Sequence, residues 1–315
     1  MRILIVANHN KGVFVPFITE QVDALKRLGI EADYFGVHGK GIRGYLSNCS
    51  SLKAKIRDFR PDLIHAHYGL SGLLSNLQRK VPVVTTYHGS DIHAEGRNLM
   101  FSRVSIWLSA YNIFVTEQLQ KQAGYRGSNQ CTLPCGIDTF TFFSLDRLDA
   151  RKELGWDADG KYVLFSGAFD NPIKNSPLAK KAVEVLNRSH RITPDAQLVE
   201  LRGFTRQEVN LAMNAANSFL MTSHREGSPQ VVKEAMVCGT PVVSVNVGDV
   251  KDLTSGIAGC YIASHDANDI AQKLESAFSF QGKTNGYQRI IDRNLSNEKI
   301  AQRILDIYNL VLNKK

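Results

Sequence analysis

The sequence predicts an α/β protein of two domains, each built on a doubly wound parallel sheet. Short apolar, β-branched runs alternate with amphipathic stretches along the whole chain, which is typical of repeated βα units. The 315 residues exceed what a single hydrophobic core usually supports. A composition of 43% hydrophobic and 22% charged residues is that of a globular protein, and it excludes disordered, collagen-like and coiled-coil chains.

The predicted elements follow from the local pattern of residues. Strands are expected where a short apolar, β-branched run ends in polar or turn-forming residues. These runs are residues 2–7, 62–67, 82–87, 112–116, 162–166, 197–201, 219–222 and 241–245. Helices are expected at residues 16–28 and 206–216, where apolar residues recur every three to four positions. The last segment, residues 296–315, places isoleucines and Tyr308 on one face, so this helix must cover an apolar surface.

A domain boundary is predicted where the alternation of strands and helices stops. Between Gly136 and Asp157, aromatic residues lie among polar ones and no strand pattern is present. We therefore predict a first domain at residues 1–152 and a second at residues 153–295, followed by the final helix at residues 296–315. Two domains of this size leave room for a deep cleft between them.

The distribution of charge and hydropathy bounds the partners and the location of the protein. The net charge is +8, but the basic residues are not interleaved with aromatic ones, which disfavours nucleic-acid binding. Residues 40–60 form the densest basic stretch, with Asp58 as its one acid. They fit a solvated helix face, which is slightly preferred, or peripheral contact with anionic lipid or a phosphorylated acceptor. No run reaches the roughly 18 apolar residues of a membrane span, and the first is too short for a signal peptide, so a cytoplasmic location is expected.

The cysteines and histidines do not form a metal-binding pattern. The chain has five cysteines without framework spacing, so reduced thiols are expected. Cys131 and Cys135 lack the second pair that a structural metal site needs. His65 and His67 share one face of a strand, but no third ligand is evident. The sequence therefore predicts no required metal.

The most informative stretch joins a strand to a helix. The strand at residues 219–222 leads into a loop, after which Ser228 is expected to cap a helix that Pro229 opens and Gly239 ends. The free N–H groups at the start of this helix, together with the helix dipole, make an anion site suited to phosphate. Gly227, just ahead of the helix, allows a ligand to approach the backbone.

Two glutamates flank the predicted anion site. Glu226 lies in the loop and Glu234 in the second helical turn, so a ligand lying across the helix start could touch both. A carboxylate accepts two hydrogen bonds at once, which matches the vicinal hydroxyls of a ribose or a hexose. Taken singly, Glu226 is better interpreted as a partner of the helix dipole and Glu234 as an exposed helical acid.

Residues 226–244 resemble the donor-binding signature of the retaining family 4 glycosyltransferases, which have the GT-B fold. Residues 134–138 resemble the interdomain turn of that family, and residues 62–67 and 86–91 resemble motifs of its amino-terminal domain. The resemblance implies two Rossmann-like domains that face a central cleft, with the final helix crossing back to the first domain. It also implies that the first domain binds the acceptor and the second domain binds the nucleotide sugar.

Carried over by position, the resemblance implies roles for single residues. Glu234 would hold the ribose hydroxyls of the nucleotide, and Glu226 would hold the hydroxyls of the donor sugar. The diphosphate would face the backbone of the helix start, which is formed by Gly227, Ser228, Pro229 and Gln230. His88, which follows the strand at residues 82–87, matches a histidine that the family places against the donor sugar; a packed core histidine is the alternative.

Lys174 matches the lysine that neutralises the leaving pyrophosphate in this family. The family usually has an arginine a few positions earlier, where this chain has Ala168 and Phe169, so one phosphate-binding cation is missing. We hypothesise that Arg202, Arg225 or another nearby base takes its place.

Two glycines complete the expected donor site. Gly12 follows the first strand and is expected to let the backbone approach the sugar phosphate, with a plain turn as the alternative. Gly167, at the start of the segment that carries Lys174, is also placed among the donor-binding residues.

The resemblance implies a metal-independent enzyme that transfers a hexose-type sugar from a UDP- or GDP-sugar to an acceptor hydroxyl, with retention of configuration. The nucleotide sugar is a substrate, and no separate cofactor is expected. The acceptor is expected to be a glycan or a lipid-linked sugar in cell-envelope or exopolysaccharide assembly. Two alternatives remain open: a nucleotide-sugar epimerase of the same fold, and an inactive nucleotide-sugar-binding subunit, which the missing arginine motivates.

Overall fold

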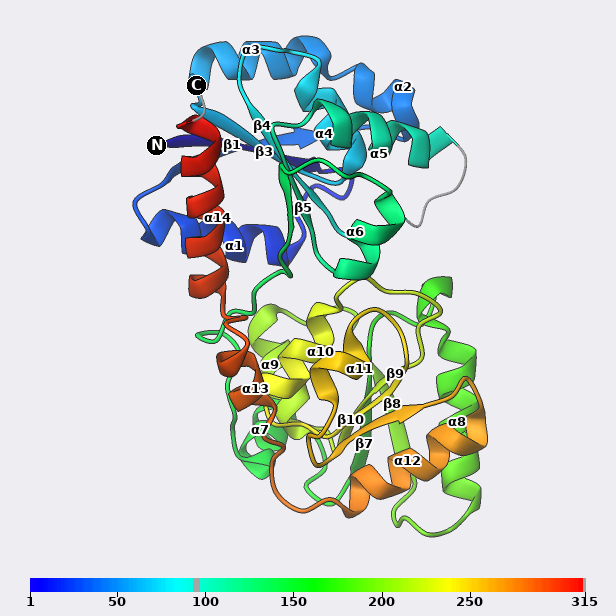
Figure 1. Ribbon diagram of the computed structural model, residues 1–315. Helices are drawn as coiled ribbons and strands as arrows, with labels where there is room; N and C mark the ends of the chain where they lie inside the picture. The colour runs from blue at the N-terminus through cyan, green and yellow to red at the C-terminus, as the bar shows by residue number, and fades with distance from the viewer. Residues whose placement is uncertain (93–96, 314–315) are drawn as a thin grey trace. The chain divides into compact units, whose positions relative to one another are not determined.

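The computed structural model describes residues 1–92 and 97–313, and it divides into two compact α/β units (Figure 1). Unit 1 comprises Met1–Gly136 together with Asn297–Lys315, and unit 2 comprises Ile137–Ser296. Each unit holds one parallel sheet with helices packed against it. The prediction of two doubly wound, Rossmann-like domains is therefore confirmed.

Unit 1 has a sheet with the strand order β2-β1-β3-β4-β5-β6, in which every strand pair is parallel. Its strands are β1 Arg2–Asn8, β2 Glu31–Val37, β3 Leu63–His67, β4 Val83–Tyr87, β5 Tyr111–Phe114 and β6 Gln130–Thr132. Its helices are α1 Pro16–Arg27, α2 Gly41–Leu46, α3 Cys49–Phe59, α4 Gly69–Asn76, α5 Arg97–Leu108, α6 Glu117–Ala123 and α14 Asn297–Leu312. The strand order changes direction between β1 and β3, and such a switch leaves a crevice at the carboxyl ends of the strands.

Unit 2 has a parallel sheet with the strand order β11-β10-β9-β7-β8. Its strands are β7 Lys161–Phe165, β8 Ala196–Glu200, β9 Ser218–Met221, β10 Val242–Val245 and β11 Cys260–Ala263. Its helices are α7 Arg147–Leu154, a 3₁₀ turn at Pro172–Lys174, α8 Ser176–Arg188, α9 Arg206–Ala215, α10 Gln230–Val237, α11 Val250–Thr254, α12 Ala267–Ser279 and α13 Gly286–Asp292. The order changes direction between β7 and β9, which places a second crevice at the carboxyl ends of these strands.

The helix α14 returns to unit 1 and lies beside α1 (Figure 1). Ile304 and Tyr308 on its inner face are buried, and the Tyr308 hydroxyl lies 2.5 Å from Nδ1 of His65 in β3. Arg27 at the end of α1 pairs with Glu298 at 2.8 Å on the outer side. The apolar face expected for the final segment therefore covers unit 1, and residues 314–315 of that segment lie outside the described residues.

The boundary between the two units lies earlier in the chain than we expected. The structure assigns residues 137–152 to unit 2, whereas we had placed them in the first domain. The backbone N–H of Phe143 donates to Asn210 in α9, and the buried Arg151 side chain donates to the carbonyl of Ala215 at 3.0 Å. The segment lacks a strand pattern, but side chains of unit 2 satisfy its polar groups, so it belongs to that unit.

Within residues 1–92 and 97–313, no helix is long and apolar enough to cross a membrane. The core strands account for most of the apolar runs in the chain. Residues 3–7 of β1 are all buried, as expected for a parallel strand that is covered on both faces.

Candidate functional site

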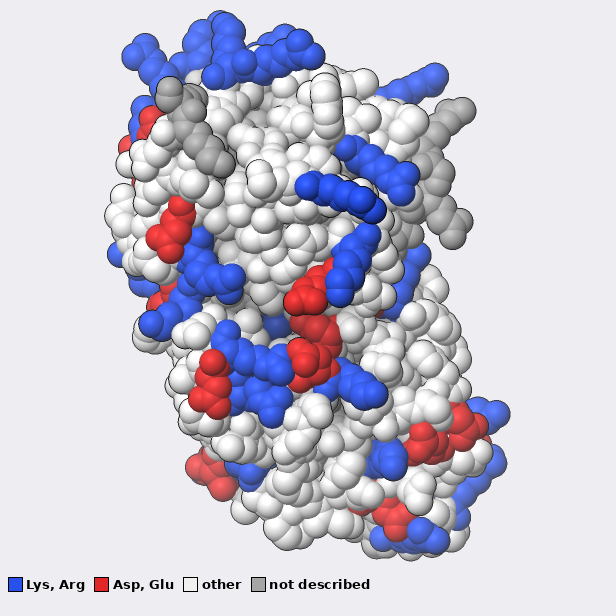
Figure 2. Space-filling view, viewed as in Figure 1, with Lys and Arg blue, Asp and Glu red and all other residues white. Residues whose placement is uncertain are grey.

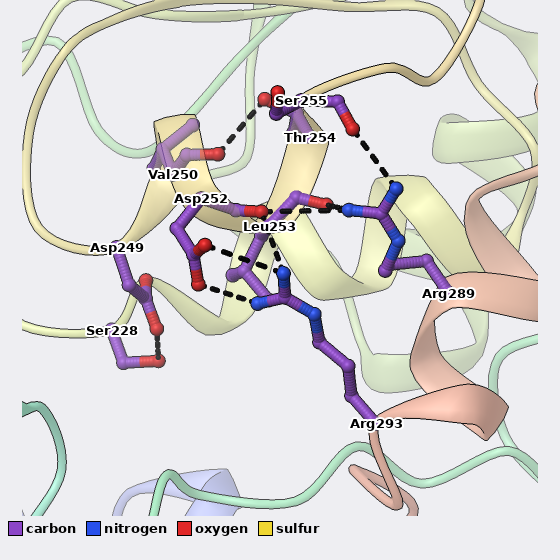
Figure 3. Close-up of polar contacts among 9 residues, drawn as sticks. All are labelled: Ser228, Asp249, Val250, Asp252, Leu253, Thr254, Ser255, Arg289 and Arg293. Carbon is purple, nitrogen blue, oxygen red and sulfur yellow. Dashed lines mark hydrogen bonds and ion pairs between the residues drawn. The ribbon is translucent and has the colours of Figure 1, made fainter.

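The start of α10 is formed as the sequence predicts, except for its cap. The helix begins at Gln230, one residue later than expected, and Pro229 is the N-cap residue with a φ of −69°. Ser228 does not cap the helix, because its hydroxyl donates to Oδ2 of Asp249 at 2.6 Å (Figure 3). The first N–H groups of a helix have no partner within the helix, so this end remains suited to an anion.

Glu234 lies in α10 and is 2% exposed, which excludes the interpretation of an exposed helical acid. Its Oε1 is 2.8 Å from a guanidinium nitrogen of Arg206, and its Oε2 has no hydrogen-bond partner among the described residues. Burial raises the pKa of the Glu234 carboxyl, and the Arg206 charge opposes that rise. One carboxylate oxygen is thus held by the protein, and the other is buried and unsatisfied.

Lys174 and Glu226 form an ion pair with a Nζ–Oε1 distance of 2.8 Å. Their side chains are 18% and 17% exposed, so Lys174 is not simply solvated. Lys174 ends the 3₁₀ turn after β7, and its carbonyl accepts a hydrogen bond from the hydroxyl of Thr222, which follows β9. A Cβ at Gly167 would lie 3.2 Å from the Lys174 side chain, so this glycine makes room for the lysine stem.

Arg206 is a functional candidate that the sequence analysis did not name. It is the first residue of α9, and its guanidinium lies 4.5 Å from the centre of the buried Phe142 ring while it pairs with Glu234. Of the two bases that we did name, Arg202 pairs with Asp170. Arg225 is exposed and forms no ion pair with another residue in the described part of the chain.

A second loop supports the segment that carries Glu226. A Cβ at Gly248 would lie 2.1 Å from the carbonyl oxygen of Gly227, so the two backbones approach as closely as glycine allows. Gly248 has a φ of 56°, and Asp249 follows it as the N-cap residue of α11. Burial raises the pKa of the Asp249 carboxyl, and the charge of Lys233 lowers it. Sequence reasoning missed Gly248 and Asp249.

The short helix α11 is itself held by α13 (Figure 3). Arg289 donates to the carbonyls of Leu253 and Ser255, at 3.1 and 2.9 Å. Arg293 pairs with the carboxylate of Asp252 at 2.5 Å. Contacts therefore continue from α13 through α11 and Asp249 to Ser228 at the start of α10.

Each basic side chain of this site lies near an acidic one. Lys233 is fully buried in α10, and its Nζ donates to the side-chain oxygen of Gln230 at 3.0 Å. Lys174, Lys233 and Arg206 each lie near a carboxylate, as the ion pairs and the opposing charge effects on pKa show. An incoming anion would compete with these carboxylates for the same cations.

His88 and Gly12 belong to unit 1, whereas the residues around the start of α10 belong to unit 2. His88 follows β4, and its Nε2 is 3.0 Å from Nδ1 of His67. Its ring lies 4.7 Å from the ring of Tyr68 and 4.8 Å from that of Phe17. Gly12 has a φ of 75°, and a Cβ there would meet nothing within 4 Å, so it forms an open turn after β1.

His65 of β3 has no ring nitrogen left for a metal ion. Both ring nitrogens of His65 are engaged, one with the Tyr308 hydroxyl and the other with the hydroxyl of Thr86 at 2.7 Å. Burial lowers the pKa of His65 to about 3, so the ring is neutral. Across residues 1–92 and 97–313, no group of three or more His, Cys, Asp or Glu side chains is placed to hold a metal ion. Metal independence remains a prediction.

Two family models match this chain. A model described as Glycosyltransferase Family 4 matches residues 7–140, and one described as Glycosyl transferases group 1 matches residues 175–279. The chain belongs to the family 4, group 1 glycosyltransferases. The second match contains Glu226 and Glu234, and the first contains His88 and Gly12.

Curated relatives of this glycosyltransferase-family chain act in different contexts. The putative teichuronic acid biosynthesis glycosyltransferase TuaC of Bacillus subtilis is 29% identical over 251 residues, which are 70% of this chain and 62% of the relative. The D-inositol 3-phosphate glycosyltransferase of Mycolicibacterium gilvum is 26% identical over 268 residues, which are 71% of this chain and 60% of the relative. The chain therefore spans about three fifths of the length of these relatives.

Solved structures confirm the GT-B fold of this glycosyltransferase-family chain. Sucrose-phosphate synthase from Thermosynechococcus elongatus has a TM-score of 0.80 at 17% identity, with 100% of both chains covered. Anabaena HepE, solved in complex with UDP, has a TM-score of 0.71 at 16% identity, with 97% of this chain and 99% of HepE covered. UDP-GlcNAc 2-epimerase from Methanocaldococcus jannaschii has a TM-score of 0.64 at 13% identity, with 98% and 100% covered. At these identities the likeness shows the fold alone.

Proposed function

We propose that this chain is a retaining glycosyltransferase that moves a hexose-type sugar from a UDP- or GDP-sugar to an acceptor hydroxyl. The observation that carries the proposal is the grouping of Lys174, Glu226 and Glu234 around the start of α10. A cation, an open helix start and two carboxylates are the groups that a sugar diphosphate nucleotide needs. The family membership supports glycosyl transfer as the reaction.

The diphosphate is proposed to bind at the start of α10. Ser228 and Gln230 supply backbone N–H groups there, whereas Pro229 has none and instead fixes the backbone at the turn. Lys174 would leave Glu226 in part and place its charge on the departing phosphate. Charge that develops on a leaving group is best stabilised by groups already in place. Lys174 and the N–H groups at the start of α10 are therefore the expected source of most of the rate enhancement.

The two glutamates are proposed to hold different sugar rings. Glu234 presents a buried Oε2 that lacks a partner, which suits a ribose hydroxyl, while Arg206 keeps Oε1 in place. Glu226, which is partly exposed, is proposed to bind the hydroxyls of the donor sugar, and His88 of unit 1 is proposed to contact the same sugar.

The transfer itself is proposed to be a front-face displacement. The bond from the anomeric carbon to the phosphate oxygen breaks, the bond to the acceptor oxygen forms on the same face, and the acceptor proton passes to the leaving phosphate. The protein groups hold and neutralise the diphosphate and take no proton in this scheme. We propose that neither a metal nor a further cofactor is needed, because Lys174 and the helix start supply the positive charge.

The acceptor is proposed to be a glycan or a lipid-linked sugar, bound by unit 1, in the assembly of a cell-envelope or exported polysaccharide. The name of the Bacillus subtilis relative, which refers to teichuronic acid biosynthesis, supports this context. We propose a cytoplasmic protein that contacts anionic membrane through residues 40–60. Sedimentation with anionic vesicles tests that contact, and a protein that stays in the supernatant contradicts it.

The proposal is tested first by removing the cation. Lys174→Ala should reduce turnover by roughly 100- to 1000-fold while the fold remains intact, because the lysine acts on charge that develops during transfer. Lys181→Ala, an exposed lysine of α8, is the matched control and should leave turnover unchanged. Steady-state transfer from UDP- and GDP-sugars, with the melting temperature of each variant, gives the result. Equal turnover in both variants contradicts the role of Lys174.

Nucleotide binding is tested separately in a thermal-shift screen of nucleoside diphosphates and their sugars. A ligand at 100 times its dissociation constant should stabilise the protein by roughly 2.7 kcal/mol. A second candidate function, an inactive nucleotide-sugar-binding subunit, is favoured by Arg202, which pairs with Asp170 instead of adding charge beside Lys174. Nucleotide binding without transfer to any acceptor would support it, and isomerised donor in the absence of acceptor would support an epimerase.

A further inference from the structure

Two histidine rings of unit 1 lie edge to edge where β3 and β4 end. Nδ1 of His67 is 3.0 Å from Nε2 of His88, and the ring centres are 5.2 Å apart with 21° between the ring planes. With so short a nitrogen contact, this separation requires both nitrogens to lie close to the line that joins the ring centres. The two rings are therefore nearly coplanar, which is the geometry of a straight N–H···N hydrogen bond.

The ring of His67 is neutral. Figure 2 shows that lysine and arginine side chains gather on the surface of unit 1 over α3, whereas the side chain of His67 is fully buried. Burial lowers the pKa of His67 well below its ordinary value, and the neighbouring rings of His65 and His88 lower it further. A neutral imidazole carries one hydrogen, on either Nδ1 or Nε2. His67 therefore donates from only one of its two nitrogens.

The surroundings of the second nitrogen decide where the hydrogen of His67 lies. Its Nε2 is buried and has no hydrogen-bond partner among the described residues. A hydrogen on Nε2 would leave a buried N–H without an acceptor, whereas a hydrogen on Nδ1 leaves only an unused lone pair. Among buried backbone groups an N–H without a partner is rarer than an acceptor without one, and we apply the same preference to the ring. The hydrogen therefore belongs on Nδ1, so His67 donates and Nε2 of His88 accepts.

The other nitrogen of His88 faces a thiol. A ring whose Nε2 accepts a hydrogen bond carries its own hydrogen on Nδ1, and Nδ1 of His88 is 3.6 Å from Sγ of Cys135. Sulfur is a weak acceptor, so this N–H is only weakly bound. The rings of Tyr68 and Phe17 pack against His88 at 4.7 and 4.8 Å and hold its orientation. The orientation of the ring is thus fixed by packing, and the place of its hydrogen by His67.

We propose that His67 is a positioning residue that fixes the tautomer of His88, so that His88 carries its ring hydrogen on Nδ1. This inference rests on the proposed function, in which His88 contacts the donor sugar, and it gives the direction of that contact. His88 would donate from Nδ1 to an oxygen of the sugar, which is a stronger acceptor than the Cys135 sulfur that it replaces. His88 would not act as a base, because the lone pair of its Nε2 is held by His67.

Nuclear magnetic resonance of the full chain, labelled with 15N in its histidine rings, tests the tautomer directly. Two-bond correlations between ring hydrogens and nitrogens at neutral pH show which nitrogen of each ring carries the hydrogen. We expect His67 and His88 each to carry it on Nδ1. The variant His88→Gln identifies the His88 signal by its loss. A hydrogen on Nε2 of His88, or on both of its nitrogens, overturns the proposal.

Two variants of equal size show whether His67 sets this tautomer. His67→Asn keeps an N–H group that can donate to His88, whereas His67→Asp offers carboxylate oxygens, which only accept. The hydrogen of His88 should stay on Nδ1 in the Asn variant and appear on Nε2 in the Asp variant. For the donor, kcat/KM should be roughly tenfold lower in the Asp variant, which is the usual effect of one lost hydrogen bond. The same His88 tautomer in both variants overturns the proposal.

A matched control and the order of the measurements separate this inference from the proposed function. His190→Gln, which alters an exposed histidine of unit 2, should leave the His88 signal and the turnover unchanged. The spectrum of the unchanged protein needs no substrate, so it decides the tautomer even if the Asp variant does not fold. A hydrogen on Nδ1 without transfer from any UDP- or GDP-sugar contradicts the proposed function alone. Transfer by a protein whose His88 carries its hydrogen on Nε2 contradicts only the inference about His67.

Discussion

Arg206 holds one oxygen of the Glu234 carboxylate and leaves the other available to the proposed ligand. The arginine holds Oε1 at 2.8 Å, and Oε2 stays buried without a partner. The Glu234 carboxylate depends on Arg206, because a buried carboxylate without its counter-ion carries a large desolvation cost. The pair is therefore a structural element, and we propose that it is also a part of the ribose site.

Removal of Arg206 should show this double role. Arg206→Ala should destabilise the protein by roughly 3 kcal/mol, because it leaves the Glu234 charge buried and unpaired. Adding Glu234→Gln should recover part of that loss, since the unpaired charge is then gone. Chemical denaturation of the two single variants and the double variant measures the coupling. If the stability lost in the double variant equals the sum of the losses in the two single variants, the two side chains do not interact.

The buried carboxyl of Asp91 should make stability depend on pH. Its Oδ1 accepts from the N–H of Gly89 at 2.9 Å, and its Oδ2 accepts from the N–H of Gly69. Burial nevertheless raises the pKa of Asp91 from 3.8 to about 6. Between these pH values the folded state binds more protons than the unfolded state, so this group lowers stability as pH rises from about 4 to 6 and adds no further change above.

Asp91→Asn should remove that dependence. Because one pKa unit corresponds to about 1.4 kcal/mol, the stability of the unchanged protein relative to the variant should fall by about 2 kcal/mol between pH 4 and pH 7. Urea unfolding of both proteins across this range gives the difference, in which the contributions of the buried histidines cancel. A difference that stays constant, or rises with pH, contradicts the raised pKa.

At this scale, the sequence predicts the residues of the motif but not their partners. Glu226, Glu234 and Lys174 are recognisable because the segments that carry them resemble motifs of the family. Arg206 lies 28 positions from Glu234, and Asp249 lies 21 positions from Ser228. Only the crossing of separate βα units brings these pairs together, and no local pattern encodes it.

The two loops at the carboxyl ends of β9 and β10 act as one element. Gly248 allows its backbone to approach the carbonyl of Gly227, and Asp249 holds the hydroxyl of Ser228. The helix α11 behind them is fixed by Arg289 and by other contacts from α13 (Figure 3). The position of the loop before α10 is therefore set by the loop before α11.

A methyl group at Gly248 should separate these loops. Gly248→Ala should weaken nucleotide binding by roughly tenfold or more, because its Cβ would lie 2.1 Å from the Gly227 carbonyl oxygen and must displace it. Gly256→Ala is the matched control: Gly256 also has a positive φ, of 76°, but a Cβ there meets nothing within 4 Å. The control should lose about 1 kcal/mol of stability and keep its nucleotide affinity. Equal affinities in the two variants contradict the proposed coupling.

The strands that the sequence failed to predict share a location. β2, β6 and β11 each lie at the edge of a sheet, and most of their residues are only partly buried. A central parallel strand is covered on both faces and reads as a continuous apolar run, whereas an edge strand carries polar residues and loses that signal. The central strands, such as β1 and β10, were predicted within one or two residues.

For the whole molecule, the sequence predicts two units of the correct type and misses where they join. The segment at residues 137–152 has no strand pattern, so its place depends on long-range contacts such as that of Arg151 with Ala215. The return of the last helix to unit 1 is likewise a long-range contact. It follows from family resemblance and from the need to cover an apolar face, and periodicity alone does not name the surface that is covered.

The contribution of α14 should be confined to unit 1. Tyr308→Ala should cost roughly 3–5 kcal/mol, because it removes a fully buried ring and its contact with His65. Hydrogen exchange should accelerate in β1, β3 and α1, with no change in unit 2. Leu310→Ala, which alters a residue 43% exposed on the same helix, is the control and should leave exchange unchanged. Faster exchange throughout unit 2 would contradict this assignment.

The interrupted course of unit 1 along the chain determines the order in which the protein can be completed during synthesis. Ribosomes release β1 to β6 early, yet the face of α1 that α14 covers stays bare until all of unit 2 has been translated. Unit 2 is one continuous stretch and can close its core while the last helix is still inside the exit tunnel. The half that emerges first is thus finished last, and for that interval its apolar surface stays exposed, which favours aggregation of the nascent chain.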